Sequence, residues 1–213
     1  GDLVCVSGYS LVGRTRDPLV EWLDTLADGV VVVLDPGATF AGLAEPLRDR
    51  VLARTDVWTG NADEAAALTG VRGMREAAEV VATLLAPDAV TIVRDGARGC
   101  AVRESGRTTH CPGHPQRPVD TNGAGDTHTG VLLAERATGA SWPEAAARAN
   151  TAGAIKVTRR GARTAPTRAE SAACLAALAH CHGPPPPSTR LPPPGSPTAG
   201  CTPSTRKPAT SAW

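Results

Sequence analysis

A short glycine-rich stretch followed directly by an aspartate carries the clearest chemical signal in this sequence. Residues 119–130 read Val-Asp-Thr-Asn-Gly-Ala-Gly-Asp-Thr-His-Thr-Gly and lead into an apolar helical run. Gly123, Ala124 and Gly125 leave the backbone uncovered, so successive amides can converge on one anion at a helix N-terminus. Asp126 then stands where a carboxylate can accept the proton of an attacking hydroxyl while a phosphoryl group transfers.

The same stretch allows a purely structural alternative. Gly-Ala-Gly-Asp could be an ordinary loop in which Asp126 caps the following helix. It is not a Walker phosphate-binding loop, because no Gly-Lys-Ser/Thr follows, and its glycine spacing does not match the dinucleotide fingerprint. The sequence therefore gives little support for a dehydrogenase.

Two further polar segments allow more than one interpretation. Asn61-Ala62-Asp63-Glu64 has the spacing of a capping box, in which Asn61 caps a helix and Glu64 closes it. Arg94-Asp95-Gly96-Ala97-Arg98-Gly99 follows a buried apolar run, and its glycines let backbone approach a ligand closely. The Arg98 side chain either contacts a phosphate or is simply solvated, and the pattern favours neither.

The elements that would position these residues alternate along the chain. Short apolar runs predict strands at 3–7, 30–34, 89–93, 99–104 and 107–111, the last two closed into a hairpin at Ser105-Gly106. Helical spacing and capping boxes predict helices at 18–27, 42–54 and 74–85, and after Ser141 and Thr167. This alternation predicts an α/β fold with a mostly parallel sheet and helices on both faces. Ligands in such folds sit at the carboxyl ends of the strands.

The ordered set of motifs resembles the ribokinase (PfkB) family of carbohydrate kinases. Residues 120–130 are similar to the family's second signature, usually Asp-Thr-x-Gly-Ala-Gly-Asp-x-Phe-x-Gly. The resemblance implies a ribokinase-like (Rossmann-like) fold, Asp126 as the catalytic base and Gly123, Ala124 and Gly125 as the anion hole. His128 stands where Phe is commoner, and we expect it to be a core or groove-wall residue rather than a second base.

Other segments are similar to family motifs in the expected order. Asn61 and Glu64 match an Asn-x-x-Glu motif, which implies a role in positioning Mg²⁺ and phosphates. Residues 94–99 resemble the nucleotide loop Thr-Leu-Gly-x-x-Gly, and Asn150 matches a position flanking the purine. The nucleotide-binding residues implied by the resemblance are Asn61, Arg94, Gly96, Arg98, Gly99 and Asn150.

The resemblance also implies which small molecules bind. ATP and Mg²⁺ are expected as cofactors, and a monovalent cation, K⁺, is expected beneath the anion hole. The K⁺ ligands would include Asp120 and backbone carbonyls near Asn122 and Val157. Tyr9, at the end of the first predicted strand, would lie with Asp126 near a sugar-like substrate.

The resemblance covers residues 1 to about 180 and begins in the middle of a typical family member. The family's first strands, its small β lid and its sugar-gripping Gly-Gly motif are not recognisable, so we expect a fragment or a natural half-kinase. Such a chain would expose a sheet edge, and a homodimer or other association through that edge is open. The globular domain is expected to span 1–182, followed by a Pro-rich disordered tail over 183–213.

Composition excludes several function classes. A formal net charge of +1 and 3% aromatic residues disfavour nucleic-acid binding. No apolar run reaches the ~20 residues that span a bilayer, and the first residues do not resemble a signal peptide. The six cysteines form no C-x-x-C pair, which favours a cytoplasmic protein with reduced thiols. Cys174, His180, Cys181 and His182 match no common zinc spacing.

Two functions follow from this sequence. The first is ATP-dependent phosphorylation of a hydroxyl group on a sugar or related small molecule, with Asp126 accepting the proton. The second is a non-catalytic nucleotide-binding remnant, or a half that needs a partner.

Overall fold

The computed structural model describes residues 1–181. The predicted Pro-rich tail, residues 183–213, lies outside the described residues. Within residues 1–181, no helix combines the length and the apolar character needed to cross a membrane.

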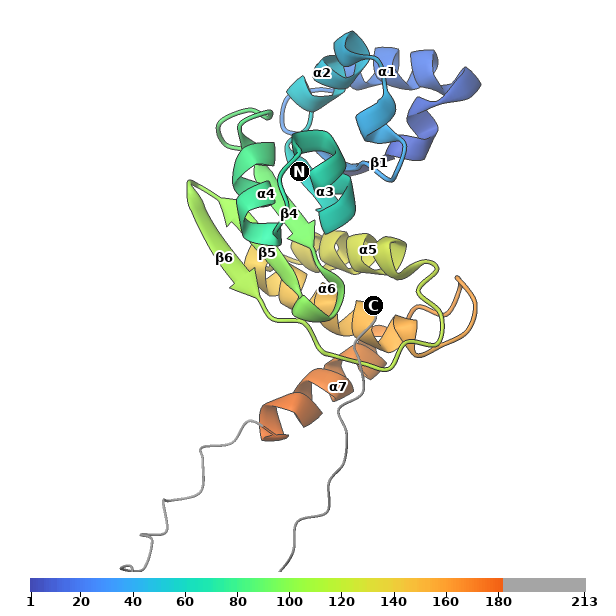
Figure 1. The fold of residues 1–213 in the computed structure, drawn as a ribbon, viewed down its shortest axis with the longest axis vertical. Coiled ribbons are helices and arrows are strands. Elements are labelled where there is room, and N and C mark those ends of the chain that lie inside the picture. Colours follow the sequence, from blue (N-terminus) through green and yellow to red (C-terminus); the bar gives the residue numbers. More distant parts are fainter. Residues whose placement is uncertain (182–213) are drawn as a thin grey trace, which may run out of the picture. The chain divides into compact units, whose positions relative to one another are not determined.

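The described part is built on one six-stranded sheet (Figure 1). Its strands are β1 (Leu3–Ser7), β2 (Val31–Asp35), β3 (Val57–Asn61), β4 (Val90–Arg94), β5 (Cys100–Glu104) and β6 (Arg107–Cys111). They lie side by side in chain order, with β1 to β4 parallel and β5 and β6 antiparallel. The prediction of a mostly parallel sheet is confirmed, as is the hairpin at Ser105-Gly106. Both turn residues have positive φ, 48° and 74°, as a two-residue hairpin turn requires.

Helices cover both faces of the sheet, as predicted. They are α1 (Arg16–Asp24), α2 (Glu45–Ala53), α3 (Ala62–Thr69), α4 (Met74–Ala82), α5 (Ala124–Ala137), α6 (Trp142–Val157) and α7 (Arg168–Cys181). Short 3-10 turns occupy 8–11, 13–15, 40–42 and 96–98. Helices α1 to α4 connect strands that advance in one direction, so right-handed crossovers place them all on one face.

The buried apolar residues form two cores, one on each face of the sheet. Val32 and Leu34 of β2 pack with α1 to α4, whereas Val33 between them packs with α5 and α6. The alternation follows from the period of two along a strand, which sends successive side chains to opposite faces. Because each central strand is buried on both faces, its sequence is almost continuously apolar.

The apolar patterns above do not predict β3. Its sequence, Val-Trp-Thr-Gly-Asn, is short, contains a glycine and runs directly into the cap of α3. Burial between two faces stabilises it nonetheless, and Trp58 is 0% exposed. β3 matters for the site, because its last residue is Asn61.

β1 forms one edge of the sheet and is less buried than β2 to β4. Cys5 is exposed there, whereas Cys100 on β5 is fully buried. The difference arises because β1 has only one neighbouring strand within the described residues.

Candidate active site

The glycine-rich stretch enters α5 with Gly123 at the N-cap. Gly123 has φ 79°, a left-handed conformation that glycine adopts without strain. Asp126 is the third residue of the helix, and no side chain makes the cap hydrogen bond. The alternative in which Asp126 is an ordinary N-cap is therefore not what the structure shows.

The first turn of α5 presents free amides beside this carboxylate. Ala124 donates to the Thr121 carbonyl over 3.1 Å, but within residues 1–181 the N–H groups of Gly125 and Asp126 find no carbonyl acceptor before the helix. Free first-turn amides and the helix dipole favour an anion at this place. Asp126 is exposed, so its carboxylate is accessible to a bound substrate.

The turn before α5 is tied to the end of α6. The Asp120 carboxylate accepts hydrogen bonds from the N–H groups of Gly161 (2.8 Å) and Asn122 (2.9 Å), and these bonds lower its pKa. The carbonyl of Val157 accepts from the N–H groups of Val119 and Asp120, at 2.7 and 3.1 Å. The start of the glycine loop is therefore fixed by backbone contacts with the segment that follows α6.

Arg94, the last residue of β4, lies beneath the glycine loop. Its side chain is 9% exposed, and Nη1 donates to the Gly125 carbonyl over 3.0 Å. Nη2 donates to the Thr59 carbonyl over 3.3 Å. The same Nη2 lies 3.5 Å from the Asp35 carboxylate and 3.8 Å from that of Glu64. The resemblance placed Arg94 among the nucleotide contacts, but its guanidinium is engaged in the interior.

Asn61 and Glu64 form both bonds of a capping box. Asn61 Oδ1 accepts from the Glu64 N–H over 2.8 Å, and Glu64 Oε2 accepts from the Asn61 N–H over 2.7 Å. The structural role weighed above is thus present, and it orients both side chains at the carboxyl end of β3. Burial raises the pKa of Glu64. The hydrogen bond from the Asn61 N–H and the charge of Arg94 act in the opposite direction and reduce this rise.

These carboxylates are compatible with a magnesium ion shared with phosphates. No group of three or more acidic, His or Cys side chains within residues 1–181 could hold a metal by itself. Mg²⁺ commonly takes only one or two carboxylates and completes its shell with water and substrate phosphates. Glu64, in the first turn of α3, and Asp35, at the end of β2, are 14% and 18% exposed and fit that description.

The loop after β4 makes a close backbone crossing. Gly99 has φ 91°, and a Cβ placed on it would lie 2.1 Å from the Cys111 carbonyl oxygen. Gly96 also has positive φ, 52°. The exposed Arg98 makes a two-pronged ion pair with Asp95, at 2.7 Å for each nitrogen, at the surface of this loop.

Asn150 on α6 joins that crossing to α5. Its Nδ2 donates to the carbonyls of Cys111 and Pro112, at 3.0 and 3.1 Å, and its Oδ1 lies 3.1 Å from His128 Nε2. Burial, with a smaller effect of Arg94, lowers the pKa of His128 to about 3. His128 is therefore neutral and buried, which agrees with a core residue and not a second base.

Tyr9 follows β1 at the same end of the sheet. Its side chain is 59% exposed and its ring lies against Gly37, where an added Cβ would be 2.7 Å from Cε2. Cys5, which sequence reasoning did not connect with the site, lies near two of its carboxylates. Desolvation raises the pKa of the Cys5 thiol, and the charges of Asp35 and Asp126 add to the rise.

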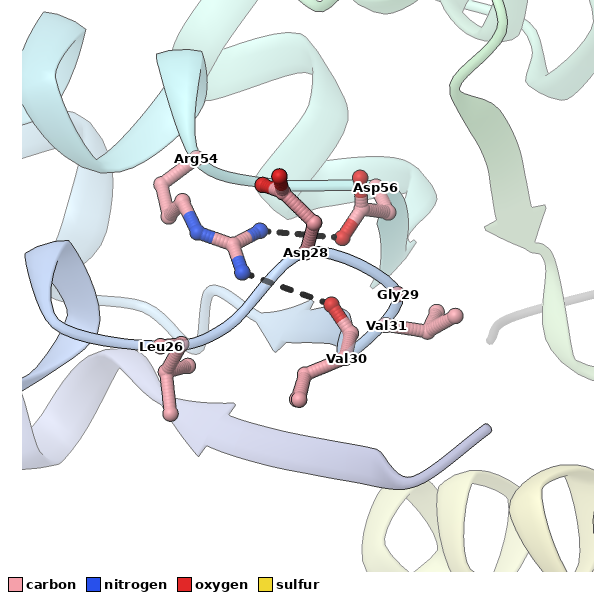
Figure 2. A pocket seen from close by; sticks show the side chains of 7 residues that line it. All are labelled: Leu26, Asp28, Gly29, Val30, Val31, Arg54 and Asp56. Carbon is pink, nitrogen blue, oxygen red and sulfur yellow. Dashed lines mark hydrogen bonds and ion pairs between the residues drawn. The ribbon is translucent and has the colours of Figure 1, made fainter.

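Two hollows open on the described surface. One, of about 360 Å³, lies in the loops that lead into β2 and β3, at the end of these strands opposite to Asp126. Figure 2 shows the residues that line it. It is lined by Leu26, Asp28, Gly29, Val30, Val31, Arg54 and Asp56. The other, of about 490 Å³, is lined by residues of α3, α4 and the loop after β4, including Asp95 and Arg98. Only the second borders the candidate site.

The arrangement of the glycine loop, Asp126 and the nucleotide-type loop agrees with a family comparison. The profile described as "pfkB family carbohydrate kinase" matches residues 1–169. The chain belongs to the pfkB family. The resemblance inferred from the motifs and the ribokinase-like fold are both confirmed.

Proteins similar to this pfkB-family chain include sugar and riboside kinases. An uncharacterised sugar kinase of Escherichia coli K12, YegV, is 32% identical over 176 residues, which cover 80% of this chain and 53% of YegV. A Vibrio cholerae O395 fructokinase double mutant, solved with fructose, ADP and potassium ion, is 26% identical with a TM-score of 0.72, covering 82% of this chain and 60% of that one. An aminoimidazole riboside kinase from Salmonella enterica, solved with its riboside and an ATP analogue, is 28% identical with a TM-score of 0.70, over 81% and 62%. The chain spans about half the length of the curated relatives it matches.

Proposed function

We propose that this chain is the catalytic, nucleotide-binding part of an ATP-dependent kinase that phosphorylates a hydroxyl group of a sugar or related small molecule. One observation carries the proposal. Asp126 is exposed in the first turn of α5, beside amides that have no acceptor within the described residues. A proton acceptor and an anion-binding helix terminus thus lie within one turn.

Each residue of the loop has a role in this proposal. Asp126 accepts the proton of the substrate hydroxyl as that oxygen attacks the γ-phosphorus. The loop Gly123–Gly125 brings the backbone amides onto the transferring group and stabilises its developing charge. Glu64, with Asp35 beside it, would hold Mg²⁺ on the phosphates. When bound, Mg²⁺ supplies charge neutralisation between the phosphate oxygens.

The remaining site residues frame the nucleotide and the substrate. Gly96, Gly99 and the exposed Arg98 form a loop over which the phosphates would lie, with Asn61 at the end of β3. Asn150 acts by holding Cys111 and Pro112 in place beside Gly99, since its hydrogen bonds go to the protein interior. Tyr9 offers an exposed ring against which a sugar can pack.

The test is ADP release by the purified chain with Mg²⁺ and ATP across sugars and nucleosides. Asp126→Asn should reduce substrate-dependent release by at least about a thousandfold while leaving ATP binding within about twofold, because it removes the base and keeps the fold. Asp17→Asn is the matched control: it also alters an exposed first-turn aspartate, on α1. Equal release by the Asp126 variant and the parent would contradict the assigned base.

A second candidate is a non-catalytic nucleotide-binding module, or a half completed by a partner. It is favoured by the edge position of β1 and by the coverage of only 53% and 47% of two curated relatives. The same assay separates the two functions. Nucleotide binding without substrate-dependent ADP release from any acceptor would support the module, and release by this chain alone would reject it.

A cytoplasmic location belongs to the same proposal. Cys5, Cys100, Cys111 and Cys174, the cysteines whose state is described, are all free thiols. Free thiols are the usual state in a reducing compartment.

A further inference from the structure

Lys156 is a buried cation that the proposed reaction does not use. It lies in the last turn of α6 and is 0% exposed. Its ammonium donates to the backbone carbonyl of Asp120 over 3.1 Å. An ammonium removed from water is costly unless negative charge or oxygen acceptors surround it.

The surroundings of Lys156 are negative. The Asp120 carboxylate is near enough for its charge and that of Lys156 to interact. The pKa of that carboxyl is lowered first by the Gly161 and Asn122 amides, and then by the charges of Lys156 and Arg160. The C-terminal end of α6 adds the negative pole of the helix dipole, which favours a cation in the last turn.

The same position is where the family resemblance implies a monovalent cation. Some of the oxygens implied as K⁺ ligands already accept hydrogen bonds. The two carboxylate oxygens of Asp120 accept from Asn122 and Gly161, and the Val157 carbonyl accepts two N–H groups, which use both its lone pairs. A K⁺ among these groups would also lie close to the positively charged Lys156 ammonium, which repels it. While the Lys156 ammonium is in place, its positive charge makes these residues a poor fit for K⁺, and only its removal would admit the ion.

We propose that the Lys156 ammonium takes the place of the monovalent cation beneath the glycine loop. It holds the Asp120 turn against the end of α6 from within the chain, and the turn leads directly to Gly123 at the cap of α5. Stability and loop geometry then require no external K⁺. The proposal rests on the proposed function only for the loop's role as an anion hole.

Thermal unfolding tests this proposal without requiring enzyme activity. The parent chain should show the same Tm, within about one degree, in KCl and in tetramethylammonium chloride at equal ionic strength. Lys156→Met keeps the apolar stem and removes the charge, so its Tm should fall by roughly 5 °C. K⁺ should restore part of that loss. Arg160→Met, which removes an exposed charge near the same carboxylate, is the matched control and should change little.

Three results would overturn the proposal. They are a parent Tm that rises with K⁺, a Lys156→Met chain as stable as Arg160→Met, and a Lys156→Met loss that K⁺ does not reduce. If Lys156→Met fails to fold, Lys156→Arg decides the matter, because it should stay folded and K⁺-independent. ADP release is measured in the same two salts. If no chain releases ADP but the unfolding results hold, the proposed kinase function fails and this inference stands.

Discussion

The guanidinium of Arg94 donates a hydrogen bond to the carbonyl oxygen of Gly125 over 3.0 Å, from behind the anion-binding turn. The amide of Gly125 faces the proposed phosphoryl site, and the carbonyl of Gly125 faces Arg94. The same guanidinium lies within 4 Å of the carboxylates of Asp35 and Glu64. One buried cation thus connects the ends of β2 and β4 with the starts of α3 and α5.

Removing this cation should destabilise the chain and loosen the glycine loop. Arg94→Met leaves two largely buried carboxylates without their partner, a change that costs about 3 kcal/mol or more. Urea unfolding at neutral pH measures the loss. Arg98→Met is the control, because its side chain is 75% exposed and its ion pair is worth little. Equal losses in the two variants would show that Arg94 does not hold the loop.

The stability of the chain should depend on pH through His128. Its folded-state pKa is about 3, against 6.5 for the free side chain, so the folded chain keeps the imidazole neutral. Above pH 6.5 the contribution of the neutral imidazole to the free energy of unfolding is fully present. This stabilisation is lost as the pH falls from 6.5 towards 3, because in that range the unfolded chain binds a proton that the folded chain does not. The free energy of unfolding falls by at most about 1.4 kcal/mol per pH unit from this cause.

His128→Phe should remove this part of the pH dependence. The free energy of unfolding of the variant, measured by urea between pH 7 and pH 4, should fall less steeply than that of the parent. Carboxylates titrate equally in both chains, so the difference in slope isolates the imidazole. Parallel curves would mean that His128 is solvated or charged in the folded chain.

The crossing of Gly99 with the Cys111 carbonyl should tolerate no side chain. Gly99→Ala adds a Cβ at 2.1 Å from that oxygen, so the nucleotide-type loop has to move. Gly139→Ala is the control, since Gly139 has a similar φ, 96°, with nothing within 4 Å of its Cβ position. The control should lose about 1–2 kcal/mol from the left-handed backbone alone. Gly99→Ala should lose more and bind ATP at least about tenfold more weakly; equal losses would contradict the close crossing.

Local patterns in the sequence determined most of the elements and the chemistry of the loop. The apolar run at 30–34 and the capping box at Ser141–Glu144 are local signals, and the structure contains a strand at Val31–Asp35 and both bonds of that capping box. The free amides beside Asp126 also follow from glycines and small residues at adjacent positions. β3 was not predicted because a five-residue strand with a glycine carries little periodic signal, and only burial on both faces stabilises it.

Only the tertiary structure decided where the buried charges go. The family resemblance places Arg94 in a nucleotide-type loop, whereas no motif singles out Lys156, and the sequence does not show the direction of either long side chain. Packing turns Arg94 inward to Asp35 and Glu64, and Lys156 to the Asp120 carbonyl. These partners are far apart in sequence. A buried charge must find compensation wherever the fold brings acceptors together, and spacing along the chain does not encode that meeting.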